Sequence, residues 1–257
     1  RSFKTRPGAM MIIAALFGGP FASTCYVVGL QMAGSIVVPI SALCPAIGAI
    51  LARFLFRQPL TPRMMLGILI CFSASALIGF SSMGGIEARP HMMLGLLFGF
   101  LAALGWGIEG CVCGYGVSII DSEVGITIRE VTIGISNLII LVPILGWIGQ
   151  TDGFAMLGKA LADMDSMKWF IVAGFLCYFN FMCWYRGNAM CGAALGMACN
   201  GAYSFWGPFF CWLILGVFFG LDGWNMAPVA WVGAVLMVVG IFTIATNPLA
   251  LFRRKEQ

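Results

Sequence analysis

The sequence predicts an all-α integral membrane protein with about eight transmembrane helices. Three observations support this fold class: an apolar composition, a series of apolar stretches about 20 residues long, and a helix-pair pattern that occurs twice. Apolar residues make up 61% of the 257 residues and charged residues 9%, whereas a soluble domain has about 25% charged residues. A soluble core cannot bury so much apolar surface, but a bilayer accommodates it.

Eight apolar stretches have the length that a helix needs to cross a bilayer, about 20 residues. In chain order they cover residues 9–31, 35–56, 64–82, 92–118, 127–149, 169–190, 196–219 and 228–250. Backbone polar groups in hydrocarbon must pair within the protein, so we expect each stretch to be a helix. Alternation of polar and apolar residues over about ten residues, which is typical of outer-membrane strands, does not occur in them.

The pair of stretches 35–56 and 64–82 has a counterpart later in the chain. In the first copy, Pro45 is followed by an apolar run, a short polar turn and Gly67, and in the second copy Pro208 is followed in the same way by Gly233. Proline to glycine spans 22 residues in one copy and 25 in the other. Because many transporters are built from duplicated helix sets, this pattern favours a two-repeat architecture.

The segment from Pro45 to Gly67 resembles the helix–turn–helix of the EamA-type drug/metabolite transporter (DMT) superfamily. It keeps that family's proline, its Leu60-Thr61-Pro62 run and its glycine, but has Gln58 where the family usually has glutamate. The second copy is looser, with Asp222 near the acidic position. The resemblance implies ten helices in two inverted five-helix repeats, with a central cavity and alternating access for a small polar metabolite.

On this mapping the first repeat covers residues 1–83 with three helices, and the second covers 92–250 with five. The first two helices of the first repeat are therefore expected to be missing from this sequence. The chain also begins with Arg1 rather than methionine, which suggests a cut or processed position. The alternative is that the eight helices are the complete set.

Small residues line one face of the stretch 92–118. At about 100° per residue, Gly95, Gly99, Ala103, Gly110 and Gly114 fall within a narrow arc. Such a face lets helix backbones approach closely in lipid. The glycines either simply pack helices together or form a smooth seam along which helices slide during access switching. The seam could serve within one chain or between two copies, so a homodimer is left open.

Glu109 is the strongest candidate for a coupling or gating residue, because apolar and glycine-rich sequence surrounds it. A carboxylate in such a place takes up a proton or finds a cation. The next stretch carries Arg129 and Glu130 near its start, at a depth about 8 Å from that of Glu109. We expect a Glu109–Arg129–Glu130 cluster near the cytoplasmic mouth. It would be a structural ion pair, or a gate or proton-coupling site, unless Arg129 extends to the interface without a partner.

Amide and aromatic side chains within the apolar stretches are the candidates for substrate binding. They are Tyr26, Trp106, Asn137, Tyr178, Asn180, Asn200 and Tyr203. The stretches 169–190 and 196–219, which carry the last four of these, also contain Trp184, Tyr185 and Trp206. An asparagine in mid-membrane either pairs with a neighbouring helix or lines a wet cavity. Rings that flank amides suit an amphipathic organic solute, because the rings cover apolar parts and the amides orient polar groups.

The distribution of basic residues predicts the orientation of the chain. When the connections alternate between the two sides, most of the 14 Lys and Arg residues fall on one side, and only Arg89, Lys159 and Lys168 fall on the other. Connections rich in Lys and Arg stay cytoplasmic. We therefore expect a multi-pass protein of the plasma (inner) membrane, with both chain ends cytoplasmic and the connection 150–168 outside.

The sequence lacks the residue patterns needed for metal binding, hydrolysis or nucleotide binding. The ten cysteines follow no metal or disulfide spacing, and a single histidine, His91, cannot build a zinc site. The HExxH, GxSxG and P-loop spacings are absent from the sequence. We therefore expect no enzyme activity, no cofactor, no metal and no nucleic-acid partner, and we expect the lipid bilayer and a small-molecule substrate as partners.

These observations together predict a secondary transporter, an exporter or exchanger of a small polar or amphipathic metabolite that works by alternating access, with proton coupling as one option. The alternative is a membrane scaffold or assembly protein that transports nothing.

Overall fold

The computed structural model is helical throughout the residues that it describes, which are 5–34, 37–41, 43–57, 60–81, 91–200, 206, 209–220 and 228–245. No strand occurs in these ranges. Four helices are long and apolar enough to cross a membrane by length and composition: Arg6–Ala33, Met92–Gly116, Ser122–Ile148 and Met164–Cys191. They coincide with four of the eight predicted stretches. Shorter helices occupy the other four, and the count of eight crossings stays a prediction.

The first long helix consists of α1 (Arg6–Leu16), the π-helical turn η2 (Phe17–Phe21) and α2 (Ala22–Ala33). Thr5 caps it, since its hydroxyl accepts a hydrogen bond from the Gly8 N–H at 3.2 Å. Pro20 lies inside η2. A proline lacks the N–H that continues the α-helical ladder, so the chain makes a wider turn there and the Ala22 N–H reaches back to the Phe17 carbonyl.

Three shorter helices follow: α3 (Val37–Ser41), α4 (Cys44–Phe56) and α5 (Pro62–Ser81). Pro45 lies in the first turn of α4, where its missing N–H leaves no hydrogen bond unmade. The helix ends at Arg57, which adopts a left-handed conformation with φ of 52°. Thr61 caps α5 by accepting a hydrogen bond from the Met64 N–H.

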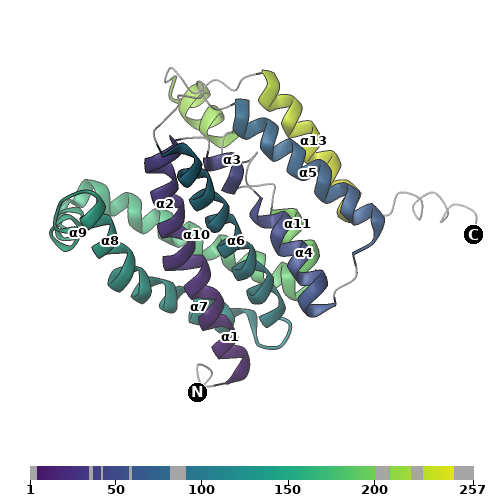
Figure 1. The fold of residues 1–257 in the computed structure, drawn as a ribbon, viewed down its shortest axis with the longest axis horizontal. Helices are drawn as coiled ribbons and strands as arrows, with labels where there is room; N and C mark the ends of the chain where they lie inside the picture. The colour runs from purple at the N-terminus through teal and green to yellow at the C-terminus, as the bar shows by residue number, and fades with distance from the viewer. Residues whose placement is uncertain are drawn as a thin grey trace, which may run out of the picture.

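Helix α6 (Met92–Gly116) runs through the centre of the bundle, next to α2, α3 and α4 (Figure 1). Its glycines explain how close these helices lie. A Cβ on Gly95 would lie 2.6 Å from the Ala33 Cβ on α2, and one on Gly107 would lie 3.2 Å from the Cys44 carbonyl oxygen on α4. The small-residue face of the stretch 92–118 therefore packs helices together, and α6 carries further glycines on its other sides.

The next helices lie beyond the first long helix. Helix α7 (Ser122–Ser136) continues through the π-helical turn η4 (Asn137–Leu141) into α8 (Val142–Ile148), and a tight turn leads to α9 (Gly153–Ala162) and α10 (Met164–Cys191). Helix α7 packs against α1, and α10 packs against α7. Aspartates cap α7, α9 and α10, because the carboxylates of Asp121, Asp152 and Asp163 each accept a hydrogen bond from a free N–H of the first helical turn. Residues 171–179 of α10 are exposed, as lipid contact would require.

The last described elements are α11 (Ala193–Asn200), the π-helical turn η5 (Trp212–Phe218) and α13 (Pro228–Ala245). Helix α13 lies along α5 at one edge of the molecule (Figure 1), and Cys71, Ala74, Ala234 and Met237 form the core between them. Helix α11 packs against α4 and α6, where Met197 fills the space beside Gly48 and Gly110. Helices α5 and α13, the second helices of the two predicted copies, are thus direct neighbours.

Candidate substrate and coupling site

The Glu109 carboxylate is buried where α6 crosses the first long helix, and its residue exposes only 6% of its surface. Gly18 of η2 makes room for it, since a Cβ at that position would lie 1.8 Å from the Glu109 Oε2 atom. Trp106, one turn earlier on α6, donates its indole N–H to the Gly18 carbonyl at 3.0 Å. The π-helical turn at Pro20 therefore supplies both the space for the carboxylate and a carbonyl acceptor beside it.

Arg129 on α7 holds the Glu109 carboxylate. Its Nε atom donates to Glu109 Oε1 at 2.7 Å, and its Nη1 atom donates to Glu130 Oε1 at 2.5 Å. Arg129 is 8% exposed, whereas the Glu130 side chain is 38% exposed and reaches solvent or lipid headgroups. One cation thus lies between two carboxylates. The structure brings these three residues together, and their role in coupling or gating stays a prediction.

Aromatic rings on α10 extend from this ion-pair cluster. The Arg129 guanidinium lies over the Phe181 ring at 3.9 Å from the ring centre, a favourable cation–π distance. Phe181 contacts Trp184 edge-on at 6.1 Å between ring centres, and Trp184 contacts the fully buried Tyr185 at 5.2 Å. The rings form one packed unit, which we call the α10 aromatic cluster (Phe181, Trp184, Tyr185).

Trp184 also lines a pocket of about 480 Å³ between α10 and α11. The lining includes three amides and two indoles, from Asn180, Trp184, Asn188, Asn200 and Trp206. The residues from α10 follow helical spacing, because Asn180, Trp184 and Asn188 are each one turn apart and share a face. The pocket and the ion-pair cluster therefore have the α10 aromatic cluster between them.

Asn188 was not among the candidates from the sequence, although it lies two turns after Asn180 on the same face. It is 1% exposed, and neither atom of its amide has a hydrogen-bond partner. Gly196 makes room for it, since a Cβ there would lie 1.4 Å from the Asn188 Oδ1 atom. An unpaired buried amide is unfavourable, and in a native structure it calls for a physical explanation.

The other predicted binding residues lie in different places. The Tyr26 and Trp106 rings contact each other at 5.2 Å on the side of α6 that faces α2. Asn137 begins η4, where its Oδ1 atom is buried without a hydrogen bond. Tyr178 is 41% exposed on α10. Tyr203 lies outside the described residues. Of the six predicted binding residues that the structure describes, Asn180 and Asn200 line the pocket.

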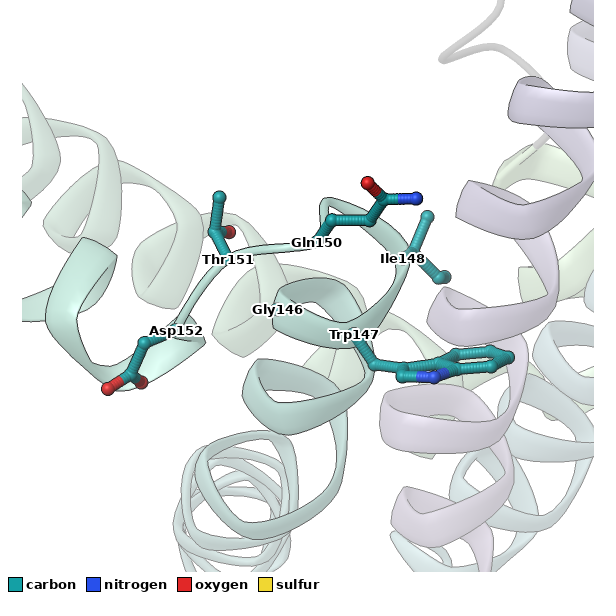
Figure 2. A pocket seen from close by; sticks show the side chains of 6 residues that line it. All are labelled: Gly146, Trp147, Ile148, Gln150, Thr151 and Asp152. Atoms are coloured by element: carbon teal, nitrogen blue, oxygen red, sulfur yellow. The ribbon is translucent and has the colours of Figure 1, made fainter.

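A second hollow, of about 760 Å³, surrounds the turn between α8 and α9. Figure 2 shows that the side chains along it diverge: Trp147 and Asp152 point to opposite sides of the turn, and Gln150 points away from both. Such an open surface has no convergent polar groups, so we do not treat it as a binding site. Among the described residues, no group of three or more His, Cys, Asp or Glu side chains is arranged to hold a metal ion.

The fold has a counterpart among solved structures. The chain is similar to a protein described only as a crystal structure of a protein, with a TM-score of 0.64 and 16% sequence identity over 100% of this chain and 80% of the other. At this identity the likeness concerns the fold alone. No protein-family model matches the chain, and no curated protein matches it.

Proposed function

We propose that the protein is a secondary transporter, an exporter or exchanger that moves a small polar or amphipathic metabolite by alternating access. The observation that carries this proposal is a pocket lined by amides and indoles, which packed aromatic rings connect to a buried ion-pair cluster. Both lie in a chain that has four helices long and apolar enough to span a bilayer. Buried ionisable groups within membrane helices typically belong to substrate or ion pathways.

The two-repeat architecture is part of the proposal. Two inverted repeats would place equivalent helices around a shared pseudo-twofold axis, where each meets its own counterpart. The contact of α5 with α13 is of this kind, because Gly67 of the first pattern lies on α5 and Gly233 of the second lies on α13. This pairing, together with the resemblance to the EamA-type DMT superfamily, supports eight crossings that belong to two five-helix units.

The coupling proposal rests on the charges of the ion-pair cluster. With all three groups ionised, Arg129 faces two carboxylates and the cluster carries one net negative charge. A proton on Glu109 would free Arg129 to pair with Glu130 alone, and the guanidinium would then move relative to the Phe181 ring that it covers. Because Phe181 contacts Trp184 in the pocket wall, protonation and substrate binding can affect each other through these rings.

The test is flux in proteoliposomes that contain the purified protein, with and without a pH gradient. We expect uptake of at least one compound from a panel of polar and amphipathic metabolites, and we expect the gradient to stimulate it. Glu109→Gln should abolish the pH dependence while the protein still inserts and folds. A variant with unchanged pH dependence would remove Glu109 from the coupling mechanism.

The same vesicles distinguish a transporter from a membrane scaffold. A scaffold moves no solute and gains no thermal stability from any compound of the panel. Trp184→Ala should slow transport more than Trp147→Ala does, because Trp184 lines the pocket whereas Trp147 lies at the open turn between α8 and α9. Equal flux in empty vesicles and in vesicles with the protein, across the panel, would contradict the transporter proposal.

A further inference from the structure

We propose that the pocket between α10 and α11 takes an uncharged, flat molecule that presents a hydrogen-bond donor next to an acceptor, as a ring-bound carboxamide or a lactam does. This inference rests on the proposed function and narrows its substrate to one chemical class.

The first reason is that the pocket lacks a countercharge. None of the described residues that line it is charged, and the sequence has no Asp, Glu, Lys or Arg between Cys191 and Gly220. On α10, Arg186 projects elsewhere and pairs with Glu123 of α7. A charged ligand would therefore lose its hydration in the pocket without an opposite charge to replace it, which strongly disfavours its binding.

The second reason is the pair of indoles. Trp184 is held by Phe181 and Tyr185, and Trp206 stacks on Phe210 with ring centres 5.7 Å apart. Rings that neighbours hold in place present fixed flat faces at little entropic cost on binding. Flat apolar or aromatic bodies gain most from such faces, because stacking adds to the area that they bury.

The third reason is the set of amides. Each asparagine side chain carries an acceptor oxygen and an NH₂ donor, and three of them line this one pocket. The Asn188 amide is the most informative, because both its polar atoms are buried and unpaired. A ligand with a donor beside an acceptor satisfies such a group on both sides once the side chain turns toward the pocket. A ligand with an acceptor alone leaves the amide oxygen unpaired.

The test compares four probes of nearly equal size with the purified full-length protein at pH 7, by ligand-observed NMR titration. Benzamide is uncharged with a donor and an acceptor, acetophenone has the acceptor alone, benzoate is an anion and benzylamine is a cation. We expect benzamide to bind at least tenfold more tightly than each of the other three. Equal or tighter binding of acetophenone overturns the donor–acceptor requirement, and tighter binding of either ion overturns the uncharged class.

Variants assign the preference to the pocket. Asn188→Leu should remove the advantage of benzamide over acetophenone, and Asn200→Leu, at a less tightly packed position, should reduce it even if Asn188→Leu folds poorly. Thr24→Val is the matched control, because the Thr24 hydroxyl is also buried and unpaired but does not line the pocket. If both asparagine variants keep the full preference, the pocket assignment is wrong. Absence of flux in the proteoliposomes would overturn the transporter proposal instead. The binding ratios could still be measured, because the titration does not depend on transport.

Discussion

The Glu109 carboxylate occupies the space that a side chain at position 18 would need. The buried ion pair therefore depends on a glycine at this position. We expect Gly18→Ala to destabilise the protein by about 3–5 kcal/mol, the usual effect of breaking a buried ion pair. The added Cβ would lie 1.8 Å from Glu109 Oε2 and must displace the carboxylate from Arg129. Chemical unfolding in detergent measures the change.

The control for this prediction is Gly134→Ala on α7, where an added Cβ meets nothing within 4 Å. Alanine favours a helix over glycine by about 1 kcal/mol, so this variant should be neutral or slightly more stable. If the two variants unfold alike, the Glu109–Arg129 pair contributes nothing measurable to stability.

At the residue scale, the sequence could predict partners on successive helices whose depths differ by no more than long side chains can reach. The Glu109–Arg129–Glu130 contact is an example, since periodicity and the connection between the two helices limit which groups can meet. It could not predict that Tyr26 and Trp106 meet between α2 and α6 while Asn180 and Asn200 line a pocket between α10 and α11, because the pattern within a helix does not say which helix faces it. The spacing of eight residues between Asn180 and Asn188 could have placed Asn188 on the same face of α10.

At the scale of elements, the start of α10 depends on one exposed carboxylate. The Ser166 hydroxyl donates a hydrogen bond to Asp163, and the Asp165 N–H donates another, so the pKa of the Asp163 carboxyl is lowered from its ordinary value. A group with a lowered pKa in the folded state stabilises the fold fully above its unfolded pKa, about 3.9. That contribution is lost as the pH falls through the lower, folded value.

Asp163→Ser tests this cap, because serine also caps a helix but carries no titrating charge. We expect the wild-type protein to lose more thermal stability than Asp163→Ser between pH 5 and pH 3, and the two to respond alike between pH 6 and pH 8. The difference between the proteins removes the contribution of the other carboxylates. Parallel curves down to pH 3 would mean that the charged cap does not stabilise α10.

The crossing of α5 and α13 depends on a second close approach. A Cβ on Gly240 would lie 2.5 Å from the Cys71 Sγ atom and 3.0 Å from the Gly67 carbonyl oxygen, and backbone cannot move aside as a flexible side chain can. Gly240→Ala should therefore cost about 1–3 kcal/mol through overpacking. Thermal unfolding measures the effect, with Gly174→Ala on the exposed face of α10 as the control. A Gly240 variant as stable as the control would show that the two helices separate easily.

The sequence predicted where helices begin and end more closely than it predicted the π-helical turns inside them. The described helices begin or end within a few residues of the apolar stretches, because length and hydropathy limit them. The π-helical turns at Phe17–Phe21 and Asn137–Leu141 were not predicted, although Pro20 and Pro143 are the signals. A proline in an apolar helix can produce a kink, a wider turn or an end, and the choice depends on the neighbouring helices.

At the scale of the whole molecule, the ion-pair cluster and the pocket lie on opposite sides of the α10 aromatic cluster. The chain thus separates the groups that can hold a proton from those that can hold a solute, and α10 contacts both α7 and α11. A rigid link of this kind can transmit only a discrete shift of packed rings, because dense interiors do not deform continuously.

The proposed orientation gives the last prediction. If basic connections are cytoplasmic, the chain end at Gln257 lies inside and the turn around Gln150 to Asp152 lies outside. A green fluorescent protein joined to the C-terminus should therefore fluoresce, because it folds in the cytoplasm. Alkaline phosphatase inserted after Gln150, in the exposed turn before α9, should be active, because it needs the oxidising exterior. Exchanging the two reporters should silence both, whereas activity of the phosphatase at the C-terminus would show an even number of crossings between the two sites or the reverse orientation.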